Sequence, residues 1–117
     1  MDLARVIIFT QDVGRLVNFY ASHFGLELVG EADPGWTELN AGGCNLAFHK
    51  FSGSVEKGDK ADNGIKFVFG TRDVAAERSR LQNLGVEMTK IFDFGDIRMC
   101  DGSDPDGNRF QISSRGL

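Results

Sequence analysis

The same order of apolar and polar segments occurs twice along the chain. Residues 3–10 and 65–69 are short runs rich in β-branched and aromatic side chains, which is typical of β-strands. An aspartate that can cap a helix follows each run, Asp12 in the first half and Asp73 in the second. Apolar residues then recur at helical spacing, so the pattern predicts a strand followed by a helix in each half.

Glycines are expected to end both helices, Gly25 in the first half and Gly85 in the second, because glycine adopts the left-handed conformation of a helix C-cap without strain. Three more short strands are predicted in each half, and the Asp-Pro-Asp-Gly sequence at 104–107 has the residues of a type I turn before the last of them. These strands are expected at residues 26–31, 36–40 and 45–50 and at residues 86–92, 96–100 and 109–113. The pattern predicts an α+β fold made of two βαβββ modules.

The two halves also align as sequences, which indicates an internal duplication. With Asp12 placed over Asp73, the strand, the helix and the following glycine of one half fall on those of the other. A polar stretch rich in Lys, Asp and Gly separates the halves and is typical of a linker. We expect one domain over residues 1–117, built from module 1 at 3–51, a linker at 52–63 and module 2 at 64–114.

Composition and charge narrow the classes of partner. The 117 residues include 17 acidic and 13 basic side chains, which gives a net charge of −4, and the sequence has no basic run. Binding to nucleic acid is therefore not expected, because phosphate contacts need clustered Lys and Arg. No apolar run approaches the length of a membrane span, so no membrane partner is expected. Cys44 and Cys100 lack the spacing of a metal site and fit a reduced, cytoplasmic location.

The duplicated pattern resembles the vicinal oxygen chelate superfamily, which includes glyoxalase I, the bleomycin-resistance proteins, fosfomycin-resistance transferases and extradiol dioxygenases. Residues 12–20 (DVGRLVNFY) and 104–110 (DPDGNRF) carry most of this resemblance, which extends over residues 5–113. The resemblance implies the glyoxalase/bleomycin resistance/dioxygenase fold, in which curved mixed sheets surround a cup-shaped pocket. It also implies a homodimer.

In the metal enzymes of that superfamily, the first and last strands of each module supply the ligands of a divalent ion. Carried over residue by residue, the first-strand positions fall on Arg5 and Lys66, and the last-strand positions fall on His49 and Gln111, each of which follows a Phe. Arg and Lys are cations without a lone pair for a metal, and they would repel a divalent ion. We therefore expect no metal cofactor at the family site.

The same departure from the family predicts a different ligand. Side chains alternate along a strand, so apolar residues on the same face as Arg5, Lys66 and His49 would line the cup, with these three at one level. An apolar cup with cations suits a small organic molecule that carries an acidic group. Two alternatives are that Arg5 pairs with an acid on a neighbouring strand and that Lys66 extends into solvent. The expected ligand-binding residues are Arg5, Ile7, Phe9, Trp36, Ala47, His49, Lys66, Val68, Gln111 and Phe94, the last at a bend.

Three functions compete on these residues. The leading interpretation is a metal-independent small-molecule binding protein similar in type to the bleomycin-resistance proteins, and not an enzyme. An enzyme of glyoxalase, lyase or dioxygenase type would need a divalent metal held by His49 and Gln111 with partners such as Glu38 or Asp101. A metal-free enzyme would have His49 as its best candidate general base. The third alternative is a non-catalytic subunit or regulator.

Overall fold

The computed structural model describes residues 3–51 and 65–117. The chain divides into two compact units, Met1–Ser54 and Val55–Leu117, and each is described by itself. The linker expected at 52–63 lies outside the described residues. No helix in the described ranges is long and apolar enough to cross a membrane.

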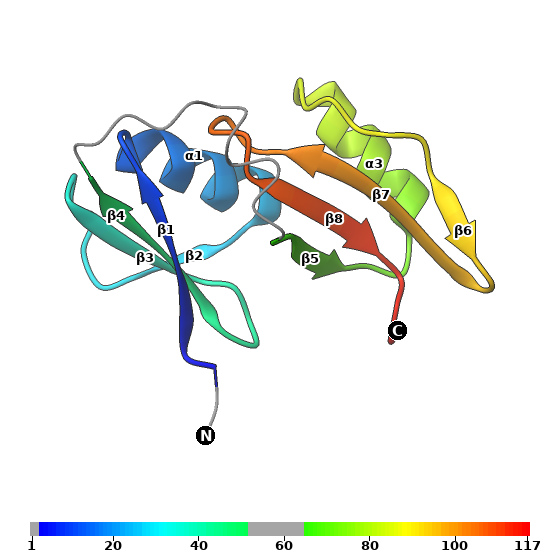
Figure 1. Cartoon of the computed structure of the whole chain (residues 1–117), viewed down its shortest axis with the longest axis horizontal. Coiled ribbons are helices and arrows are strands. Elements are labelled where there is room, and N and C mark those ends of the chain that lie inside the picture. Colours follow the sequence, from blue (N-terminus) through cyan, green and yellow to red (C-terminus); the bar gives the residue numbers. More distant parts are fainter. Residues whose placement is uncertain (1–2, 52–64) are drawn as a thin grey trace. The chain divides into compact units, whose positions relative to one another are not determined.

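The first unit is one helix packed on one four-stranded sheet (Figure 1). The sheet has the order β1-β4-β3-β2, with β1 parallel to β4 and the other neighbours antiparallel. The parallel pair arises because α1 carries the chain across the sheet between β1 and β2. Its elements are β1 (Arg5–Thr10), α1 (Val13–Phe24), β2 (Glu27–Val29), β3 (Trp36–Asn40) and β4 (Asn45–Lys50).

The second unit repeats this topology. Its sheet has the order β5-β8-β7-β6, with β5 parallel to β8, and α3 packs on β7 and β8. Its elements are β5 (Phe67–Gly70), α3 (Val74–Asn83), β6 (Phe92–Phe94), β7 (Ile97–Ser103) and β8 (Arg109–Ser113). The predicted α+β fold of two βαβββ modules is confirmed.

Both helices begin at the predicted aspartates. The carboxylate of Asp12 accepts the backbone N–H of Arg15 at 3.0 Å, and that of Asp73 accepts the N–H of Ala76 at 3.0 Å. These bonds satisfy N–H groups that have no partner within the helix.

The helix ends differ slightly. Gly25 caps α1 with a φ of 66°, as expected. The cap of α3 is Leu84, and Gly85 follows it with a φ of 91°. The N–H of Val86 bonds to the carbonyl of Leu81, which completes a Schellman motif around Gly85.

Each core lies between the helix and one face of its own sheet. In the first unit Leu16 and Tyr20 of α1 pack with Leu39 and Phe48 of the sheet, and all four are fully buried. In the second unit Leu81, Cys100 and Phe110 are the equivalent buried residues. Alternation along the strands therefore sends the other set of side chains to the face without the helix, which we call the open face of each unit.

The prediction of a strand over residues 86–92 is wrong. This segment makes a single bridge, Met88 to Gly102, and β6 covers only Phe92–Phe94. Between these points the segment has one more residue than β7, so the ladder is interrupted. The hydroxyl of Thr89 accepts the N–H of Asp101 at 2.9 Å, which replaces a backbone partner at the interruption.

The turn before β8 is built around Asp104, which is only 3% exposed. One carboxylate oxygen accepts the N–H groups of Asp106 and Asn108, both at 2.9 Å, and the other accepts the side-chain amide of Asn108 at 2.8 Å. The N–H of Gly107 bonds to the carbonyl of Asp104 at 2.9 Å. These bonds fix the entry of the chain into β8, the strand that carries Gln111.

Candidate functional site

The open face of the first unit collects most of the site residues predicted in that half. The strand register pairs Ile7 with Ala47 and Ala47 with Glu38, which places these three in one row across β1, β4 and β3. Ala47 is fully buried, whereas Ile7 remains exposed. The face is formed by Arg5, Ile7, Phe9, Trp36, Glu38, Asn45, Ala47 and His49.

An ion pair crosses this face at one end. The Nε of Arg5 on β1 lies 3.1 Å from Oε2 of Glu38 on β3, although β4 lies between the two strands. The amide of Asn45 on β4 donates to the same oxygen at 2.6 Å. The bond from Asn45 and the neighbouring Arg5 guanidinium lower the pKa of Glu38, although partial burial opposes them. Arg5 therefore pairs with an acid of its own sheet, but this acid is on β3 and not on the neighbouring strand β4 that the alternative implied.

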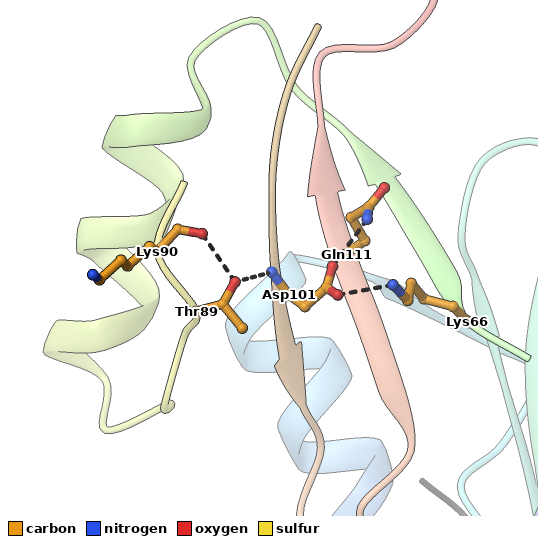
Figure 2. Close-up of polar contacts among 5 residues, drawn as sticks. All are labelled: Lys66, Thr89, Lys90, Asp101 and Gln111. Atoms are coloured by element: carbon orange, nitrogen blue, oxygen red, sulfur yellow. Dashed lines mark hydrogen bonds and ion pairs between the residues drawn. The ribbon is translucent and has the colours of Figure 1, made fainter. Parts of the chain in front are cut away.

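The open face of the second unit has an equivalent ion pair. The Nζ of Lys66 lies 2.8 Å from Oδ2 of Asp101, and the amide of Gln111 donates to Oδ1 at 2.9 Å (Figure 2). The pair again spans a central strand, because β8 lies between β5 and β7. The hydroxyl of Thr89 accepts the backbone N–H of Asp101 at 2.9 Å, as Figure 2 shows. Lys66 is exposed directly before β5, as that alternative expects, but its ammonium group pairs with Asp101 instead of extending freely into solvent.

His49 lies at the other end of the first open face. It pairs with Phe9 on β1 and with Trp36 on β3, whereas Arg5 pairs with Asn45. Four residues along a strand separate these levels by about 13 Å. The expectation that Arg5 and His49 share one level is therefore wrong, because the sequence fixes which face they occupy but not how the strands are aligned.

The strand register also changes which residue of the first unit corresponds to a metal-ligand position of the family's enzymes. Gln111 lies opposite Val68, and Val68 corresponds to Ile7 when the two capping aspartates are superimposed. The partner of Ile7 on β4 is Ala47. Ala47, and not His49, thus occupies the position that corresponds to Gln111.

The residues at these four positions do not fit a divalent metal. Arg5 and Lys66 carry no lone pair for it, and Ala47 has no donor atom. Gln111 retains one amide oxygen, but its amide nitrogen is bonded to Asp101. Zinc sites use three or four protein ligands of N, S or O type, and calcium sites use six to eight oxygen ligands, so one amide oxygen falls short of either.

The remaining predicted residues lie on the second open face. Val68 is exposed beside Gln111. Phe94 is 71% exposed and is the last residue of β6, directly before the turn at residues 95–96. The register pairs Phe94 with Ile97 on β7, at the far edge of the sheet from Val68.

Sequence reasoning missed the amide and hydroxyl groups that hold the two acids. The sequence suggests Glu38 and Asp101 only as metal ligands and gives Asn45 and Thr89 no role. Alternation could have found Asn45, because it shares a face with Ala47 and His49. No local signal could have found Thr89, since its bond to Asp101 depends on an interruption of the ladder.

Comparisons with known proteins agree with this architecture. The model of the Glyoxalase/Bleomycin resistance protein/Dioxygenase superfamily matches residues 2–112. Lactoylglutathione lyase from Agrobacterium tumefaciens is 16% identical with a TM-score of 0.75, and the match covers 98% of this chain and 96% of that one. No curated protein sequence matches the chain.

Two further solved structures are similar. TnmS3, an antibiotic binding protein from Streptomyces sp. CB03234, is 19% identical with a TM-score of 0.75 and coverage of 96% of this chain and 93% of that one. A fosfomycin resistance protein from Listeria monocytogenes, solved with Mn(II), is 20% identical with a TM-score of 0.76 and coverage of 98% and 90%. At these identities the likeness shows the fold alone, and one fold supports several chemistries.

Proposed function

This chain belongs to the Glyoxalase/Bleomycin resistance protein/Dioxygenase superfamily, and from that membership we propose that it binds a small organic molecule without a metal ion and without catalysis. One observation carries the proposal. The positions that correspond to the metal ligands of the family's enzymes hold Arg5, Ala47, Lys66 and Gln111, of which only Gln111 has a donor atom to offer.

The open faces supply the surface for such a ligand. Ile7, Phe9, Val68 and Phe94 are large apolar side chains that remain exposed on rigid strands. Sites for organic molecules combine apolar side chains of this kind with a few polar groups that orient the ligand. The similar fold of an antibiotic binding protein supports a binding function by analogy.

The charge of the ligand is the part of the sequence-based prediction that loses support. Arg5 and Lys66 are the cations expected to attract an acidic ligand. Instead, Arg5 forms an ion pair with Glu38, and Lys66 forms one with Asp101. Each pair is close to neutral, so its field on a distant anion is weak. We therefore propose a ligand whose binding does not depend on a net negative charge.

A metal-dependent enzyme is the second candidate, and one observation favours it. The Nδ1 of His49 lies 2.7 Å from the carbonyl of Lys50, and such a bond commonly leaves Nε2 of a histidine available to a metal. Against it, Glu38 and Asp101 are held by their own cations, and His49 lies about 13 Å along the strand from the level of Arg5.

Native mass spectrometry of the protein purified without chelator tests the proposal. We expect the mass of the chain or its dimer without a stoichiometric divalent ion, and no change in thermal stability on adding Mn²⁺, Zn²⁺ or EDTA. One bound divalent ion per chain, removed by EDTA with loss of stability, would overturn metal independence. The same spectrum reports whether the chain forms the homodimer that the family resemblance implies, and the mass of any small molecule that remains bound.

A further inference from the structure

We propose that Phe9, Trp36 and His49 form a subsite for a planar aromatic group that carries a hydrogen-bond donor, such as a phenolic hydroxyl. The donor bonds to Nε2 of His49, and the ring packs on the two aromatic side chains. This inference rests on the proposed function, because it names the chemical class of molecule that the first unit binds.

The hydrogen bond of His49 fixes which of its nitrogens accepts. Nδ1 lies 2.7 Å from the carbonyl oxygen of Lys50, and a carbonyl can only accept, so Nδ1 carries the hydrogen. In the neutral ring Nε2 then has the free lone pair. Within the ranges that the structure describes, no hydrogen bond to Nε2 is present, and the residue is exposed. Nε2 is thus a ready acceptor on the open face.

Two aromatic rings flank this acceptor. The centroid of the His49 ring lies 5.5 Å from that of Phe9 and 5.8 Å from that of Trp36, which it meets edge-on. Phe9 is 52% exposed, and Trp36 is partly exposed. The exposed faces and edges of these rings can contact the aromatic ring of a ligand. Aromatic rings prefer to pack offset or edge to face.

The backbone holds the three side chains in a defined arrangement. They occupy one row across β1, β4 and β3, because His49 pairs with Phe9 on one side and with Trp36 on the other. Strand positions are more rigid than loop positions, so the row is preorganised for a planar ligand. The Arg5–Glu38 pair lies at the other end of the sheet, four residues along β1 from this row.

The test compares 2-naphthol with 2-methoxynaphthalene, which has a similar ring system but no donor. Isothermal titration calorimetry of the full chain should show 2-naphthol binding about tenfold more tightly, the effect of one hydrogen bond. In His49→Phe the ring remains but the acceptor is lost, so the two probes should bind equally. His23→Phe, at the other histidine of the chain, is the matched control and should keep the tenfold preference.

A second variant separates packing from hydrogen bonding and covers a failure of His49→Phe to fold. Phe9→Leu removes a ring but leaves the acceptor, so both probes should weaken while their ratio stays near tenfold. Long-range ¹H–¹⁵N NMR spectra of the two histidines should show the Nδ1–H tautomer for His49. The Nε2–H tautomer, equal binding of the two probes by the unmodified protein, or binding of neither would each overturn the subsite.

Repeating the titration with EDTA and with Mn²⁺ separates this inference from the proposed function. A tenfold preference that requires Mn²⁺ would keep the subsite and overturn metal independence. Metal-independent binding of both probes with no preference would overturn the subsite alone.

Discussion

Replacement of Asp104 by alanine should destabilise the second unit strongly. The carboxylate accepts two backbone N–H groups and the side-chain amide of Asn108, and both Asp104 and Asn108 are buried. Alanine would leave these three donors without their acceptor, and each buried donor left unsatisfied costs about 1–3 kcal/mol. Because Asp106 is only partly buried, the loss of its bond should cost less than the loss of the two bonds from Asn108, and we expect a total loss of about 3 kcal/mol in the free energy of unfolding.

Urea denaturation followed by circular dichroism measures this loss. Asp104→Asn is the matched control, because it keeps the shape and one acceptor oxygen but turns an NH₂ group toward one of the donors. We expect Asp104→Asn to cost about half as much as Asp104→Ala, that is roughly 1–2 kcal/mol. A loss below about 0.5 kcal/mol for Asp104→Ala, the range of ordinary surface substitutions, would refute the reasoning.

Two further predictions concern one ion pair and one close contact. Because the Asn45 amide and the Arg5 guanidinium lower the pKa of Glu38 below its usual 4.5, the wild type should be more stable than Glu38→Gln at pH 7. This advantage in stability should disappear as the pH falls through the lowered pKa of Glu38. A difference in urea midpoint between the wild type and Glu38→Gln that is the same at pH 7 and at pH 3 would contradict this prediction. Gly102→Ala should cost about 1–3 kcal/mol by urea titration, since its Cβ would lie 2.6 Å from Cζ of the buried Phe110; unchanged stability would show that the ring can shift.

Features that depend on neighbouring residues were predictable from the sequence. Asp12 and Asp73 cap their helices because the carboxylate reaches N–H groups only three residues ahead. The strands at 36–40, 45–50 and 109–113 have the predicted bounds, because turn residues flank each apolar run. The duplicated order of these elements was enough to predict the fold class.

The segment 86–92 shows where local pattern is insufficient. Its residues have strand character, but a strand forms only where a neighbour supplies a matching ladder. The side chain of Thr89 takes the N–H of Asp101, and the ladder resumes one residue out of step at β6. Competition between a side chain and the backbone for one donor cannot be read from hydrophobic periodicity.

On the open faces, too, the sequence predicts some features and only the tertiary structure decides others. The sequence by itself determined that Arg5, Lys66 and His49 stand outside the core, and the family resemblance implied that two cations replace metal ligands. Only the tertiary structure decided that each cation reaches across a central strand to an acid, that Ala47 rather than His49 corresponds to Gln111, and that His49 joins Phe9 and Trp36. The physical reason is that alternation assigns a side chain to a face from local geometry, whereas its neighbours on that face depend on the register of strands distant in the sequence.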